Sequence, residues 1–186
     1  TSWKLSVYAD LFRFPWLKYG IDAPSGGQEY MAQIDYTPSR NYSAYLRYKY
    51  RQKEKNGTFE NDNLLKINTC KQHRIRFQQV YNFSSPFIFK TSLDGILFDD
   101  PIKKLNKGIM ISQSIGWKPT TLPLQIDGYL AWFHTDDYNS RVSSYEKNIL
   151  YAFNMPFFYG DGMRFALTFR LSLIHISEPT RPLYIS

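Results

Sequence analysis

Apolar and polar residues alternate with a period of two along most of this chain, and this alternation constrains the fold more than any other feature. Segment 42–52 is an example, with one face made of Ala44, Leu46, Tyr48 and Tyr50. A period of two places alternate side chains on opposite faces of a β-strand. No segment shows a convincing helical period of 3.6 residues, so we expect an all-β fold.

The alternation predicts about nine strands in an antiparallel up-and-down meander. They cover 2–12, 28–36, 42–52, 72–83, 87–98, 108–117, 124–135, 143–155 and 162–170. Short turns rich in Pro, Gly, Ser and Asn are expected at 37–41, 84–86, 118–123 and 156–160. Longer polar connections are expected at 13–27, 53–71, 99–107 and 136–142. Short turns at one end and long loops at the other are typical of bacterial outer-membrane barrels.

Composition leaves two classes of β-protein open. Aromatic residues make up 18% of the chain, yet 21% of it is charged and the mean hydropathy is −0.43. No apolar run approaches the roughly 18 residues of a transmembrane helix. The chain therefore fits a soluble β-protein or a barrel whose strands alternate lipid-facing and lumen-facing residues. We expect residues 1–170 to be an incomplete transmembrane β-barrel of a bacterial outer membrane, with the bilayer as partner and the remaining barrel strands absent from this chain.

The two strand faces predict different roles. Aromatic side chains near the strand ends on the apolar face predict a girdle at the membrane interface, formed by Trp3, Phe83, Phe87, Trp117 and Trp132. Basic side chains on the polar face predict a ladder along the lumen, formed by Arg47, Lys49, Arg51, Arg74, Arg76, Lys90, Arg164 and Arg170. With a net charge of +7, such a ladder favours anions or polyanions in a channel. The alternative is that these cations cross-link the wall through Glu29, Asp35 and Asp94.

Catalytic and metal-binding patterns are weak. The lone Cys70, in a segment expected to be a polar loop, gives no disulfide framework or metal site. His73 and His134 lack an evident nucleophile and orienting group. We therefore expect no enzyme activity, no cofactor and no metal. Two alternatives stay open: a surface binding module that uses the long connections, above all 53–71, and an outer-membrane enzyme with a Ser or His paired to a carboxylate at the rim.

The C-terminal residues form a segment of different character. Leu171–Arg181 reads LSLIHISEPTR, which closely resembles a translated sequencing-library adapter. We expect residues 171–186 to be a non-native tail and leave them out of the functional reasoning.

Four stretches carry a resemblance to a protein family. They are FRFPWLKYGIDAPSGGQEY (Phe12–Tyr30), KQHRIRFQQVY (Lys71–Tyr81), KGIMISQSIGW (Lys107–Trp117) and YEKNILYAFNMPFFYGDGMRF (Tyr145–Phe165). Together they resemble the C-terminal barrel region of Bacteroidota proteins described as helix-hairpin-helix domain-containing. The resemblance implies an upstream signal peptide and a DNA-binding module ahead of the barrel. Residues 1–170 hold no helix-hairpin-helix signature, so no DNA-binding residue is carried over; nucleic acid is an expected partner only of the full-length protein.

Overall fold

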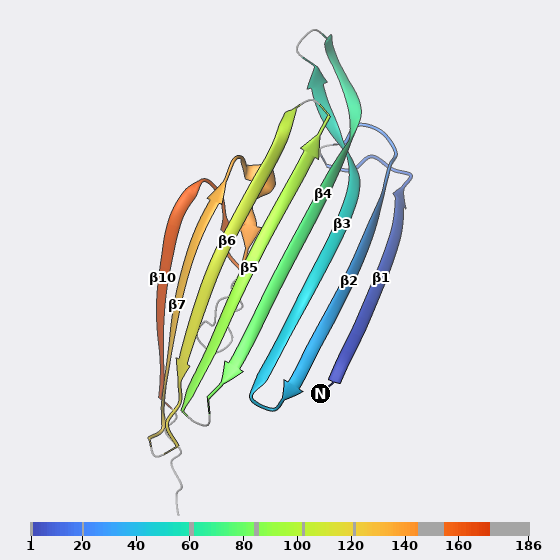
Figure 1. Ribbon diagram of the computed structural model, residues 1–186. Coiled ribbons are helices and arrows are strands. Elements are labelled where there is room, and N and C mark those ends of the chain that lie inside the picture. Colours follow the sequence, from blue (N-terminus) through green and yellow to red (C-terminus); the bar gives the residue numbers. More distant parts are fainter. Residues whose placement is uncertain are drawn as a thin grey trace, which may run out of the picture.

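The computed structural model describes residues 2–19, 21–59, 62–83, 86–101, 103–120, 122–144 and 155–171. Its main element is one eight-stranded antiparallel sheet with strand order β1-β2-β3-β4-β5-β6-β7-β10 (Figure 1). These strands are β1 (Ser2–Phe14), β2 (Ser25–Ser39), β3 (Tyr42–Phe59), β4 (Asp62–Asn82), β5 (Phe87–Asp100), β6 (Lys103–Trp117), β7 (Leu124–Thr135) and β10 (Asp161–Leu171). The all-β, up-and-down antiparallel fold is confirmed, and the barrel is not closed, because β1 and β10 each pair on one side only within the described residues.

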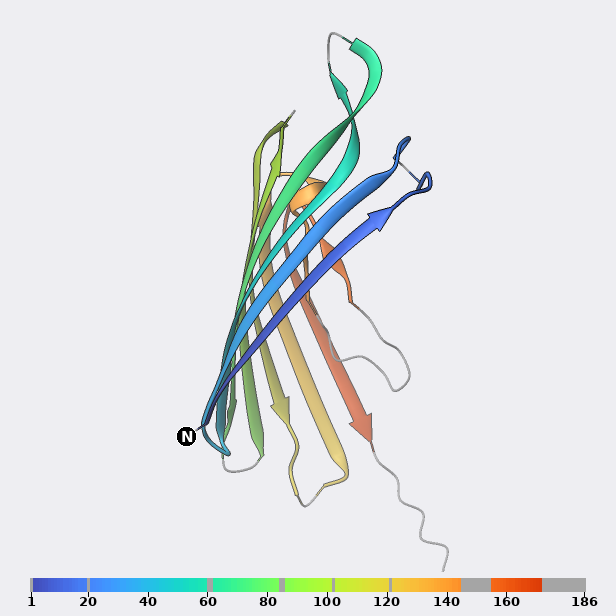
Figure 2. The ribbon, with the colours of Figure 1, turned by 90° about the vertical axis from the view of Figure 1, so that its right-hand side faces the viewer.

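The sheet curls into an open trough with one convex and one concave face (Figure 2). Every neighbouring pair of strands is antiparallel. One row of direct partners crosses all eight strands: Leu5, Ile34, Leu46, Phe77, Leu93, Ile111, Trp132 and Met163. Since a slip of one residue would turn a whole strand over, this row fixes the register of the sheet.

The prediction of a wall strand over 143–155 is wrong. β7 pairs directly with β10 from Leu124–Leu171 to His134–Asp161, so no strand separates them. Residues 145–154 lie outside the described residues, and Val142–Ser143 form the short strand β8. β8 pairs with β9 (Phe157–Phe158) in a separate two-stranded sheet. The expected short turn at 156–160 is therefore also wrong, since it contains β9.

Two of the expected long loops are strand extensions instead. β3 and β4 remain paired as far as Phe59 and Asp62, and β5 and β6 as far as Asp100 and Lys103. The β3–β4 hairpin projects beyond the other strands at the end opposite the N-terminus (Figures 1 and 2). Strand pairing there comes from backbone hydrogen bonds, which need no apolar alternation. The same strand extension places Cys70 in β4, where it is 2% exposed, and not in the predicted loop 53–71. An extension of β2 likewise places Gly26 and Gly27 in that strand and not in the predicted connection 13–27.

The described parts of the connection between β7 and β10 fold onto the concave face of the sheet (Figure 2). We call its described residues, 136–144 and 155–160, the inward segment; it contains the 3-10 turn η1 (Tyr138–Ser140), β8 and β9. Val142 (0% exposed) and Phe158 (7%) pack there in one buried cluster with wall residues Ile96, Met110, Tyr129 and Ala131. The main apolar core is thus not between two sheets but between the trough and its own inward connection.

The last strand ends at the border of the adapter-like tail. β10 reaches Leu171, which pairs with Leu124, and the other residues of the tail lie outside the described residues. Within the part of the chain that the structure describes, no helix is long and apolar enough to cross a membrane.

Candidate functional site on the two faces of the sheet

The convex face is largely apolar, and most of its large side chains are exposed. One polar row crosses β4, β5 and β6 on this face, formed by the direct partners Gln79, Thr91 and Gln113. In the apolar row that crosses the sheet, Leu93 near the centre is 42% exposed, and Leu5 and Met163 on the edge strands are 67% and 70% exposed. A contiguous apolar surface of this extent marks contact with a membrane or another protein. The surface has an upper limit, because the next convex positions beyond Tyr50, His73 and Leu97 are polar. There Gln52, Lys71 and Asp99 are direct partners on β3, β4 and β5.

Aromatic rings line the convex face at its short-turn end. Successive ring contacts, with centroids 4.3–6.5 Å apart, connect Trp3, Tyr36, Tyr42, Tyr81, Phe83, Phe89 and Phe87. Trp117 is the direct partner of Phe87 on β6. Four of the five predicted girdle residues therefore gather at one end of the sheet. The fifth, Trp132, lies near the opposite end of β7 and is 44% exposed.

The concave face brings the centre of the predicted basic ladder together. Arg47 on β3 is the direct partner of Arg76 on β4, and Lys49 is the direct partner of Arg74. Arg51 faces Gln72. Opposed like charges on one face of a sheet are destabilising unless anions compensate them.

Two carboxylates compensate part of this charge. On β2, Glu29 Oε1 is 2.6 Å from Lys49 Nζ, and its Oε2 is 3.3 Å from Arg51 Nε. On β5, Asp94 accepts a hydrogen bond of 2.5 Å from Arg76 Nε and is only 3% exposed. Cross-linking of the wall thus holds for these three cations. Asp35, the third acid considered, accepts its hydrogen bond from the neutral Gln33.

The remaining ladder residues are distributed differently. Arg47 donates to Gln33 Oε1 at 2.7 Å, and its guanidinium lies 5.2 Å from the centre of the Tyr45 ring. Within the described residues, Arg74 has no hydrogen-bond or ion-pair partner. Lys90, Arg164 and Arg170 lie on other strands of the concave face, so the structure does not bring all eight residues into one ladder.

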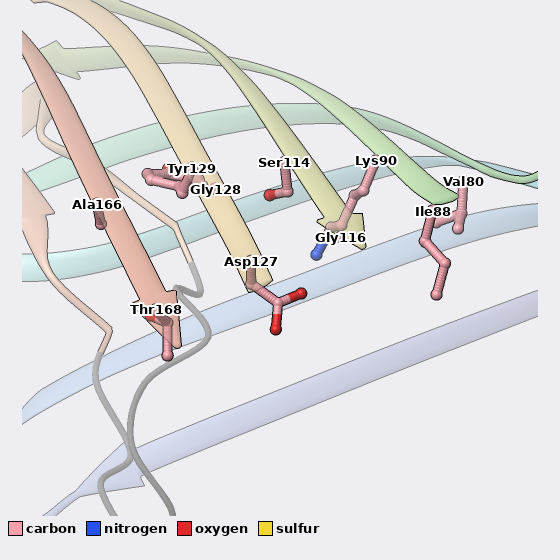
Figure 3. Close-up of a pocket in the computed structure, with 10 residues that line it drawn as sticks. All are labelled: Val80, Ile88, Lys90, Ser114, Gly116, Asp127, Gly128, Tyr129, Ala166 and Thr168. Atoms are coloured by element: carbon pink, nitrogen blue, oxygen red, sulfur yellow. The ribbon is translucent and has the colours of Figure 1, made fainter. Parts of the chain in front are cut away.

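Lys90 belongs to a separate hollow of about 180 Å³ on the concave face, between β4 and β10. Figure 3 shows Lys90 and Asp127 pointing toward one another over Gly116. A Cβ at Gly116 would lie 2.9 Å from Asp127 Oδ1, so glycine leaves room for this carboxylate. This hollow holds charges of both signs and does not extend the ladder.

Arg76 connects the wall to the inward segment. Besides its bond to Asp94, its Nη2 donates to the carbonyl oxygen of Ser143 in β8 at 2.6 Å. The inward segment is also held at its start, where Asp136 N donates to Lys107 O and Lys107 N donates to Asp136 Oδ2. Gly108 permits the close approach, since a Cβ there would lie 2.3 Å from the carbonyl oxygen of Ser140.

Sequence analysis missed three basic residues of this region. Lys53 and Lys55 continue the concave face of β3 beyond Arg51, and Arg141 lies in the inward segment. The signal was present for two of them, because Arg47, Lys49, Arg51, Lys53 and Lys55 repeat at every second position. Because the predicted strand ended at residue 52, Lys53 and Lys55 were assigned to a loop and not to the basic face.

A rim histidine is paired with a carboxylate, as the enzyme alternative required. His134 Nδ1 contacts Asp161, and His134 Nε2 is 3.7 Å from Asp136 Oδ1. Within the described residues, the polar contacts of His134 are with Asp161 and Asp136 and include no Ser, Thr or Cys side chain that could act as a nucleophile. Among the described residues, no group of three His, Cys, Asp or Glu side chains is arranged to hold a metal ion.

Comparisons with protein families, curated proteins and solved structures found no match to this chain.

Proposed function

We propose that this sheet is part of the wall of a bacterial outer-membrane β-barrel, with its convex face in lipid and its concave face along an aqueous lumen. The observation that carries the proposal is the unbroken apolar row from Leu5 to Met163 on the convex face, which is exposed on seven of the eight strands and half-buried at Phe77 on β4. Water would disfavour so large an apolar surface, whereas hydrocarbon would accept it.

The height of the apolar surface supports the same assignment. On β3 it runs from Tyr42 to Tyr50, and on β4 from Ile75 to Phe83, with Gln79 as a polar convex residue within that range. Segments of about 9–11 residues are what a tilted strand needs to cross a bilayer. The aromatic series near the short turns suits the headgroup level, where rings with polar edges are favoured.

Spin labels at adjacent positions of β1 test this assignment. We expect a label on Leu5→Cys, on the convex face, to be accessible to oxygen dissolved in lipid. A label on the matched control Ser6→Cys, on the concave face, should be accessible to a water-soluble nickel complex instead. The measurement is collision-dependent saturation of the chain in lipid vesicles. Equal access of the nickel complex to both labels would overturn the lipid-facing assignment.

As the lumen wall, the concave face should favour anions. The cations Arg47 and Arg74 have no carboxylate partner within the described residues, and they face a region rich in positive charge. We expect the assembled barrel to conduct anions preferentially in planar bilayers, and Arg74→Gln to reduce that preference. The measurement is the reversal potential in a salt gradient; cation selectivity of the unmodified barrel would contradict this role.

A further inference from the structure

A basic stripe runs along β3 on the concave face, formed by Arg47, Lys49, Arg51, Lys53 and Lys55. Residues two apart on a strand are separated by about 6.8 Å, so the four intervals give a stripe roughly 27 Å long. Two further cations on β4, Arg76 and Arg74, are the direct partners of Arg47 and Lys49 at the start of the stripe. A single small anion would contact only part of a stripe of this length, whereas an extended linear anion could contact all of it.

Two adjoining hollows lie over this stripe. One, of about 80 Å³, is lined by Lys49, Arg51, Gln72 and Arg74. The other, of about 330 Å³, includes Arg51, Lys53 and Lys55, and the β1–β2 connection contributes Lys18 to it. Arg51 lines both hollows, so they adjoin at this residue and together follow four successive rungs of the stripe. We call the two hollows together the groove.

The charge in the groove is only partly compensated. One acid, Glu29, forms ion pairs with Lys49 and Arg51. A second acid, Glu54, accepts a hydrogen bond of 2.7 Å from the neutral backbone N–H of Gly26. Lys55 Nζ donates to Asn139 of the inward segment at 3.2 Å and lies 4.9 Å from the Phe98 ring centre, both neutral groups. Burial, followed by the like charges of Lys55 and Arg51, lowers the pKa of Lys53. A bound anion would relieve this crowding of positive charge.

We propose that this groove binds one extended linear polyanion that carries repeated phosphate groups. Guanidinium forks and lysine ammonium groups are both well suited to phosphate. Successive rungs would each contact a phosphate, from the level of the apolar surface up to the base of the projecting β3–β4 hairpin. The proposal deepens the anion-favouring role of the concave face and rests on it, but binding itself requires no bilayer.

The test uses the full chain in detergent micelles, with fluorescently labelled inorganic polyphosphate and, separately, a labelled oligothymidylate. We expect binding by fluorescence anisotropy, with log K falling against log salt concentration by about 0.7 for each phosphate contacted. Binding of both probes would show that the shared phosphate backbone is recognised, and binding of one would identify the source. Binding of neither would overturn the proposal, as would orthophosphate competing as well per phosphate as the polymer.

A matched pair of variants locates the site. Lys53→Gln is expected to weaken binding roughly 5-fold and to lower the salt slope by about 0.7, while Lys53→Arg restores both. The control Lys71→Gln removes the same charge from the convex side of neighbouring β4 and should leave binding unchanged. If Lys53→Gln and Lys71→Gln weaken binding equally, the loss follows from the change in net charge and not from the groove, and the proposal is overturned. If neither probe binds but the spin-label pattern of β1 is as expected, the polyanion proposal fails and the proposed barrel-wall role is unaffected.

Discussion

Replacing Gly108 by valine is expected to expel the inward segment from the concave face. A Cβ at this position would lie 2.3 Å from the carbonyl oxygen of Ser140 and 3.0 Å from Thr135 Cγ2. The first neighbour is backbone, so a rotamer change cannot relieve the overlap. Val142 and Phe158 would then lose their burial against the wall, at a cost on the order of 3 kcal/mol in the free energy of unfolding.

Trypsin cleavage after Arg141 and urea unfolding of the chain in micelles both report this change. The control is Gly95→Val on neighbouring β5, where a Cβ would meet no atom within 4 Å. We expect rapid cleavage and lower stability for the Gly108 variant alone. Wild-type resistance of that variant to trypsin would show that the inward segment does not depend on the close approach at Gly108.

Removing the carboxylate of Asp94 should produce the second large effect. Asp94 is 3% exposed and is the anion that Arg76 contacts on the wall, with Arg47 and Arg74 beside it. Breaking a buried ion pair by removing one partner typically costs about 3–5 kcal/mol, because the other charge is left uncompensated. We expect Asp94→Ala to lower the free energy of unfolding by that amount.

A double-mutant cycle separates the pair from simple loss of packing. Asp94→Ala combined with Arg76→Met should cost less than the two single changes added together, because no buried charge remains alone. Asp35→Ala is the control, since its carboxylate accepts a hydrogen bond from neutral Gln33 and should cost about 1 kcal/mol. Additive costs for Asp94 and Arg76 would mean that their contact contributes nothing to stability.

The inward segment and the basic stripe face each other across the concave side of the sheet. Lys55 and Arg76 belong to the wall, yet both donate hydrogen bonds to the inward segment, at Asn139 and Ser143. The segment thus narrows the space beside the stripe while leaving its hollows open. Release of the segment in the Gly108 variant would remove one side of that space.

Strand type and facing were accessible from the sequence because they follow from a local rule. Side chains alternate across a strand, so the pattern of 42–52 or 124–135 states which residues share a face. The continuous row from Leu5 to Met163 confirms those faces in all eight strands. Strand ends were harder to predict, because residues 53–58 of β3 include no apolar side chain and the strand continues there through backbone pairing.

The sequence by itself thus determined an antiparallel meander with one apolar and one basic face, since periodicity and chain order suffice for both. Only the tertiary structure decided that β7 pairs with β10, that the inward segment packs on the concave face, and that Arg76 connects Asp94 to Ser143. The physical reason is that these features depend on contacts between residues far apart in the chain. The packing of residues 136–144 and 155–160 on the concave face depends on the burial of Val142 and Phe158, which no local pattern encodes.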